Sequence, residues 1–191
     1  MQFLLFILVY PVIWLISILP FRLLYLFSDF VCFLVYHVFS YRKKVVRQNI
    51  AMALPHLSEQ ERLVIEKKFY HHLCDMFLEM VKTMNISQKE MERRFVFTNL
   101  DLYLDLEKKG KSIALLCAHY ASYEWAVSMN YHITFTGYGV YKKINNKYFD
   151  RLIKKIRSRF KAPLITTRET IPTIDRNTRT NHLAVYGLAS D

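Results

Sequence analysis

The 191-residue chain is long enough to bury the core of one domain, so disulfides or a structural metal are not needed for folding. Its three cysteines, Cys32, Cys74 and Cys117, lie far apart in apolar runs, which argues against a disulfide framework and against a zinc site. The net charge of +11 favours anionic partners, such as phospholipid headgroups, acidic carrier proteins or nucleic acid, without choosing among them.

The first 41 residues are the most apolar part of the chain and carry only two formal charges. The uncharged stretch from Gln2 to Phe21 is long enough to cross a bilayer as a helix, although Pro11 and Pro20 each remove a backbone donor. A second apolar run, Leu23 to Phe39, fits a second span, a re-entrant turn or an in-plane helix. We therefore expect residues 1–41 to form a membrane anchor that begins with a hydrophobic helix.

The alternative to an anchor is a helical hairpin buried in a soluble domain. A cleavable signal peptide fits poorly, because the leader has no basic start and no small-residue cleavage site. A basic cluster follows the apolar runs and consists of Arg42, Lys43, Lys44 and Arg47. Because basic residues next to a span favour the cytoplasmic side, we expect the body of the protein to face the cytoplasm.

Residues 42–94 are expected to be a basic and amphipathic helical region that packs on the domain that follows. Ser58 and Glu61 have the spacing of a capping box, which predicts a helix start at this point. One apolar stripe recurs at helical spacing beyond it and predicts the packed face: Leu63, Tyr70, Leu73, Phe77, Met80 and Met84.

From Phe95 onward, short apolar runs alternate with helical patterns. The runs suited to strands are Ser112 to Ala118, Ile133 to Tyr141, Pro163 to Thr166 and His182 to Ala189. Helices are expected from Asp101 to Lys109, stopped by Gly110, and from Asn146 to Phe160. This alternation predicts an α/β domain over residues 95–191, with a mixed sheet flanked by helices. Because no helix follows the last run, we expect a C-terminally truncated domain; a complete domain ending in an edge strand is the alternative.

The motif that carries most chemistry is His119-Tyr120-Ala121-Ser122-Tyr123-Glu124. The same spacing recurs at His56 and Glu61, but only His119 follows a predicted buried strand, where active sites of open α/β sheets gather. A neutral imidazole can take the proton of a hydroxyl as it attacks a thioester carbonyl, and a carboxylate on the other ring nitrogen fixes the tautomer. The alternative is a helix-capping histidine with a solvated glutamate.

The stretch from Lys142 to Lys161 is strongly basic, with nine Lys or Arg against the single acid Asp150. Such density suits a phosphate-rich or carboxylate-rich partner. A solvated basic helix face explains the same pattern.

Several linked blocks resemble the late acyltransferases of lipid A biosynthesis, the lauroyl and myristoyl acyltransferase family within the lysophospholipid acyltransferase superfamily. The blocks are NIAMALP, beginning at Asn49, CAHYASYEW around His119, GVYKKINNKYFDRLIKKIRSRF and the final VYGLASD. The resemblance covers nearly the whole chain. It implies a glycerolipid acyltransferase-like fold, of which residues 95–191 are the N-terminal part of the catalytic domain.

The resemblance also implies an activity and a location. The enzyme would move a fatty acyl chain from an acyl carrier protein thioester to a hydroxyl of a lipid A precursor, at the bacterial inner membrane and facing the cytoplasm, with no metal or other cofactor. His119 and Glu124 match the family's catalytic pair. Lys142, Arg159 and Asp191 match its substrate-binding positions, although Lys142 stands where many members have arginine and lacks that side chain's two-point geometry.

Two other functions remain open from the sequence. The same chemistry with another acceptor, a glycerophospholipid or an amino-acid lipid, would need only a different pocket shape. A non-catalytic membrane module could instead bind anionic lipid through the basic stretch. Nucleic-acid binding is not expected, because the stretch has no interleaved aromatic stacking motif.

Overall fold

The computed structural model describes residues 2–189, and its backbone contacts group the chain into two compact units. One unit is residues 14–82, and the other combines residues 1–13 with residues 83–191. The sequence predicted a different division, into an anchor (1–41), a helical region (42–94) and part of a catalytic domain (95–191). That division describes expected functions, and it stays a prediction.

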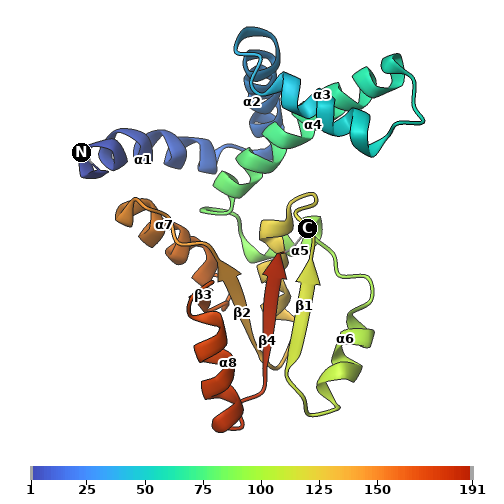
Figure 1. The fold of residues 1–191 in the computed structure, drawn as a ribbon. Coiled ribbons are helices and arrows are strands. Elements are labelled where there is room, and N and C mark those ends of the chain that lie inside the picture. Colours follow the sequence, from blue (N-terminus) through green and yellow to red (C-terminus); the bar gives the residue numbers. More distant parts are fainter. Residues whose placement is uncertain (1, 190–191) are drawn as a thin grey trace. The chain divides into compact units, whose positions relative to one another are not determined.

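The apolar amino-terminal segment forms two helices rather than one long one. Helix α1 (Gln2–Ile18) ends before Pro20, and α2 (Phe21–Phe33) continues into a π-helical turn, η1 (Leu34–Val38) (Figure 1). Among the described residues, the helical segment from 21 to 38 is the one long and apolar enough to cross a membrane, and α1 is shorter. The candidate span is therefore the second apolar run, because Pro20 cannot donate a helical hydrogen bond and separates the two.

The capping box predicted at Ser58 is confirmed. Helix α3 (Lys43–Ala53) is followed by α4 (Glu59–Lys82), which begins directly after Ser58. The Ser58 amide donates to Glu61 Oε2 over 2.8 Å, and the Glu61 amide donates back to Ser58 Oγ over 3.3 Å. These reciprocal bonds satisfy amides that the first helical turn leaves without a partner.

The buried face of α4 differs from the predicted apolar stripe. Its buried residues recur every fourth position: Glu66, Tyr70, Cys74, Leu78 and Lys82. Leu63 and Phe77, which the stripe included, are 39% and 53% exposed. The prediction failed here because two charged residues take places on the packed face: Glu66 accepts from Arg47 Nε over 2.7 Å, and Lys82 donates to the Leu19 carbonyl over 2.6 Å.

The second unit holds the α/β domain. After α5 (Gln88–Arg94) and α6 (Leu100–Glu107), its elements are β1 (Ile113–Cys117), a 3-10 helix η2 (Tyr123–Tyr131), β2 (Thr136–Tyr141), α7 (Lys147–Ser158), β3 (Leu164–Thr166), α8 (Thr170–Arg179) and β4 (Ala184–Ala189). The four strands and both helices predicted from the sequence are present. Helix α8 was not predicted from the sequence.

The four strands form one sheet in the order β1-β4-β2-β3, and each described strand pair is parallel (Figure 1). The expected mixed sheet is therefore wrong for this part of the chain. The last strand is also not an edge strand, because β4 lies between β1 and β2. The connections from β1 to β2, from β2 to β3 and from β3 to β4 each contain a helix, as connections between parallel strands of one sheet usually do.

Helices cover the two faces of the sheet. On one face, Tyr103 of α6 and Met129 of η2 pack with Val185 of β4. On the other face, Ile174 of α8 packs against a cluster that contains Tyr186 of β4. We call the first the η2 face and the second the α8 face. Successive residues of a strand point to opposite faces, so Val185 and Tyr186 mark the two sides.

A buried carboxylate fixes the start of β2. Glu107 at the end of α6 is 8% exposed and accepts hydrogen bonds from the Thr134 amide, the Phe135 amide and the hydroxyl groups of Thr134 and Tyr103. Burial alone would raise the pKa of Glu107, but these donors outweigh burial and hold the pKa below its usual value. The charged carboxylate thereby ties α6 to the connection between η2 and β2.

Candidate active site

His119 lies in the loop between β1 and η2, two residues after the strand ends at Cys117. Its side chain is exposed, and its ring meets the edge of the Tyr123 ring at a centroid distance of 4.8 Å. Ala121 between them has a φ of +50°, the left-handed region that an alanine rarely adopts. This sharp turn directs the chain from the carboxyl end of β1 into η2, as the sequence predicted for the position of His119.

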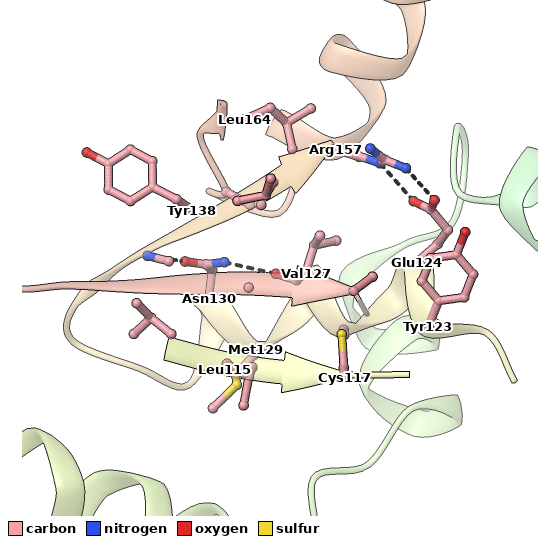
Figure 2. A pocket seen from close by; sticks show the side chains of 18 of the residues that line it. Leu115, Cys117, Tyr123, Glu124, Val127, Met129, Asn130, Tyr138, Arg157 and Leu164 are labelled. Atoms are coloured by element: carbon pink, nitrogen blue, oxygen red, sulfur yellow. Dashed lines mark hydrogen bonds and ion pairs between the residues drawn. The ribbon is translucent and has the colours of Figure 1, made fainter. Parts of the chain in front are cut away.

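Glu124, the predicted partner of His119, forms an ion pair with Arg157 of α7. Arg157 Nε donates to Glu124 Oε2 over 2.7 Å, and Arg157 Nη2 donates to Glu124 Oε1 (Figure 2). The two side chains are 12% and 17% exposed, so water screens the pair little. This two-point contact joins the first turn of η2 to α7 across 33 positions of sequence.

The hydrogen bond from His119 to Glu124 stays a prediction. A carboxylate has about four acceptor positions, so the two bonds from Arg157 leave room for an imidazole nitrogen. A carboxylate held in this way has a fixed orientation, which a partner of a general base requires.

Sequence reasoning missed Arg157 because it appeared as one of nine basic residues in a stretch that reads as a solvated surface. The available signal was the residue type. Only arginine offers a planar fork that binds both carboxylate oxygens, and residue type alone narrows the basic residues of α7 to Arg151 and Arg157. The closeness of Arg157 to Glu124 in space depends on the sheet topology, which the patterns of a single sequence do not reveal.

Lys142 follows the last residue of β2, and its side chain is exposed. The sheet is parallel, so the carboxyl ends of β1 and β2 lie at the same edge, and the structure brings Lys142 to the edge that carries His119. The loop after Lys142 is held by Asp150, which accepts from the Tyr141 hydroxyl and from the Ile144 amide over 3.2 and 3.1 Å. The single acid of the basic stretch is therefore a buried loop anchor.

Arg159, predicted to bind substrate, donates to backbone carbonyls in the connection between α4 and α5. Its guanidinium reaches the carbonyl oxygens of Thr83, Met84 and Ile86, the first and last over 3.1 and 3.0 Å. These contacts tie the end of α7 to that connection. Asp191, the third predicted substrate-binding residue, lies outside the described residues. Substrate roles for both stay predictions.

A cavity of about 110 Å³ lies on the η2 face beside the Glu124–Arg157 pair (Figure 2). Tyr123 and both members of the pair line it, together with residues of η2 and of all four strands, among them Leu115, Val127 and Met129. The His119 ring contacts Tyr123, which lines this cavity, although His119 is not itself among the lining residues. A charged pair and a histidine loop therefore meet an apolar interior at the carboxyl edge of the sheet.

No group of three or more side chains suited to holding a metal ion is found among residues 2–189. The arrangement that is present consists of an imidazole, a carboxylate fixed by arginine and an adjoining apolar cavity. These groups suit proton transfer at the polar head of a largely apolar substrate. The fold is an α/β domain with a parallel sheet, and the candidate catalytic groups lie at its carboxyl edge, where enzymes of this class carry their active sites.

The family comparison makes this class specific. The model of the bacterial lipid A biosynthesis acyltransferase family matches residues 1–191, the whole length of the sequence, and the chain belongs to that family of acyl-transferring enzymes. No curated protein matches the chain. The resemblance of the blocks around His119 and Arg159 is confirmed at the level of the family.

Proposed function

We propose that the protein transfers a fatty acyl group from an acyl carrier protein thioester to a hydroxyl of a lipid A precursor. The observation that carries the proposal is the position of His119, in an exposed loop at the carboxyl edge of the sheet and in ring contact with a wall of an apolar cavity. The family membership supports acyl transfer in lipid A biosynthesis. The donor and the acceptor hydroxyl are the finer parts of the proposal.

His119 acts as the base. Its neutral imidazole takes the proton of the acceptor hydroxyl while the oxygen attacks the thioester carbonyl. The tetrahedral intermediate then expels the thiolate, which takes the proton from the imidazolium, so the products are an ester and a free thiol. Glu124 orients the imidazole and stabilises its protonated form, and Arg157 holds Glu124 in place.

Charge supports an acidic donor protein. The exposed basic residues on and before α7 include Lys142, Lys143, Arg151, Lys154 and Lys155. Lys142 and Lys143 follow β2 at the edge that carries His119, so a negatively charged carrier bound here would deliver its thioester near the imidazole.

We further propose that the protein lies at the inner membrane with its catalytic part toward the cytoplasm. The candidate span from 21 to 38 is followed directly by the basic cluster of Arg42, Lys43 and Lys44. A carrier-protein donor is cytoplasmic, and the positive-inside rule favours the same side for the residues after the span.

The decisive test is complementation of a deletion strain with the full-length gene carrying His119→Ala, followed by mass spectrometry of lipid A. We expect the loss of one acyl group. The control is His56→Ala, since His56 has the same spacing to Glu61 but lies in the other unit. An unchanged acyl count with His119→Ala would remove the imidazole from the mechanism.

A second variant tests the orienting pair. Arg157→Lys keeps the charge but loses the two-point contact with Glu124, so we expect kcat to fall at least tenfold with little change in KM. A purely structural role of Arg157 would instead lower the amount of folded protein and leave the kcat of the remaining enzyme unchanged.

A further inference from the structure

The lining of the η2-face cavity has an unusual row of residues across the sheet. The strand register places Leu115 of β1 beside Gly187 of β4, Gly187 beside Gly139 of β2, and Gly139 beside Leu164 of β3. All four residues line the cavity, and Figure 2 labels the two leucines, Leu115 and Leu164. The two interior strands thus present glycines at the same level, with a leucine on each side, and form a trough.

Glycine is a poor strand residue because it loses the most backbone freedom on folding and contributes no side chain to packing. Crowding favours glycine at Gly139, where an added Cβ would lie 2.9 Å from Leu164 Cδ2 and the end of that side chain would have to shift. It does not explain Gly187, where the nearest heavy atom to an added Cβ is the Tyr138 carbonyl oxygen at 3.5 Å, an ordinary contact. An added Cβ therefore fits at Gly187, and the space above this residue belongs to the cavity that it lines.

The chemistry of the lining defines the occupant. Asn130, a polar residue of the wall, uses its amide within the protein: it donates to the Val127 carbonyl over 3.1 Å and accepts from the Gly137 amide over 3.0 Å. The charged side chains of the lining, Glu124 and Arg157, bind each other at one end. An apolar cavity of about 150 Å³ stays dry and binds benzene, so 110 Å³ suits a hydrocarbon segment of roughly four carbons.

The cavity has one end near the His119 loop and one end farther from it. Cys117 and Ala189 are paired at the carboxyl ends of β1 and β4, one level nearer to the His119 loop than the glycine row. Val185 and Gly137 are paired one level farther from it. A molecule whose reacting carbonyl lies at His119 would therefore extend its apolar end past the Glu124–Arg157 pair, over Gly187 and toward Val185.

We propose that the trough receives the far end of the hydrocarbon chain of the acyl group being transferred, a segment of roughly four carbons, and that Gly187 sets the chain length that fits. This inference rests on the proposed acyl transfer. Any side chain at residue 187 would project from the floor of the trough and occupy the space of about one or two methylene groups, so shorter chains would be favoured.

The test is a competition between acyl donors of different chain lengths, with the full-length protein carrying Gly187→Val and with mass spectrometry of the acylated lipid. A β-branched residue suits a strand, so the variant should fold. Excluding two methylene groups from an apolar site should shift the ratio of kcat/KM values toward the shorter donor by about tenfold. Gly187→Ala, with the smallest added group, should shift the ratio in the same direction by less.

The matched control is Ala114→Val. It also places a valine in the neighbouring strand, adding two carbons where Gly187→Val adds three, at an exposed position whose neighbours Ile113 and Leu115 belong to the η2 face. We expect no change in donor preference. Leu115→Ala widens the trough and should shift preference toward longer donors.

Equal losses for all donors with Gly187→Val and Gly187→Ala, or an unchanged preference with both, would overturn the inference. The outcome is separable from the proposed function. If His119→Ala abolishes transfer while the Gly187 variants keep the original donor preference, the trough assignment fails and the catalytic proposal stands. If His119→Ala keeps transfer, the catalytic proposal fails by itself.

Discussion

The two faces of the sheet are built from alternate residues of the same strands but are filled in opposite ways. On the α8 face, the rings of Tyr138 and Tyr186 stack at a centroid distance of 5.5 Å, and the Tyr186 hydroxyl accepts from Asn177 of α8 over 2.9 Å. On the η2 face, glycines at the corresponding level leave a cavity. The comparison teaches that large side chains hold the sheet on one face, while the other face keeps space beside the charged pair.

The strongest way to break this comparison is to remove a large, buried side chain of the packed face. Tyr186→Ala deletes a ring that is 4% exposed and leaves the buried Asn177 amide without its acceptor. We expect a loss of about 3–5 kcal/mol in the free energy of unfolding. Denaturant unfolding of the purified protein in detergent measures it.

If the two faces have separate roles, the folded fraction of Tyr186→Ala should transfer acyl chains of the original length. Tyr186→Phe is the milder control, because it keeps the ring and removes only the hydroxyl. A change in donor preference with Tyr186→Phe would show that the α8 face also shapes the substrate site.

Individual elements show which features of the fold could be predicted from the sequence. The cap at Ser58, the strand before His119 and the helix after Asn146 were predictable because each depends on residues close together in the chain. The parallel pairing of β4 between β1 and β2 was not, since it depends on contacts across more than forty positions. For the same reason the position of His119 was predictable and the partnership of Glu124 with Arg157 was not.

Helix α8 escaped prediction because it has few strong helix formers and carries Pro172 and several threonines. Proline is tolerated in the first turn, where its missing amide would have no helical partner. Threonine hydroxyls also bond within the helix, as Thr178 does to the Ile174 carbonyl over 2.9 Å. Because the intrinsic helix propensity of this segment is low, the packing of Ile174 against the α8 face stabilises the helix.

The second prediction sharpens the comparison at Glu107, the buried carboxylate that ties α6 to the connection between η2 and β2. Glu107→Gln replaces one acceptor oxygen by an amide donor that faces the donors of Thr134 and Phe135. We expect a loss of about 1–3 kcal/mol at pH 7. The size of this loss should depend on pH, because the pKa of Glu107 is lower in the folded protein than in the unfolded chain.

The sign follows from linkage. A carboxyl whose folded pKa is depressed stabilises the protein fully above its unfolded pKa, here near 4.5, and that stabilisation disappears as the pH falls through the lower folded value. The difference in unfolding free energy between the wild type and Glu107→Gln should therefore be constant from pH 7 to about 5.5 and shrink below pH 4.5. A difference that stays constant down to pH 3 would contradict a charged, hydrogen-bonded Glu107.

The smallest effect is expected at a glycine that belongs to neither face. Gly110 follows α6 and has a φ of +63°, a conformation that an L side chain adopts with strain. No heavy atom lies within 4 Å of an added Cβ, so conformational strain alone should decide the outcome of Gly110→Ala. We expect a loss of about 1 kcal/mol in unfolding free energy, with unchanged donor preference. Gly187 is the opposite case: alanine there should cost little stability but shorten the preferred acyl chain. If both substitutions changed stability alone, Gly187 would be an ordinary structural glycine, and the contrast between the two faces would reduce to packing.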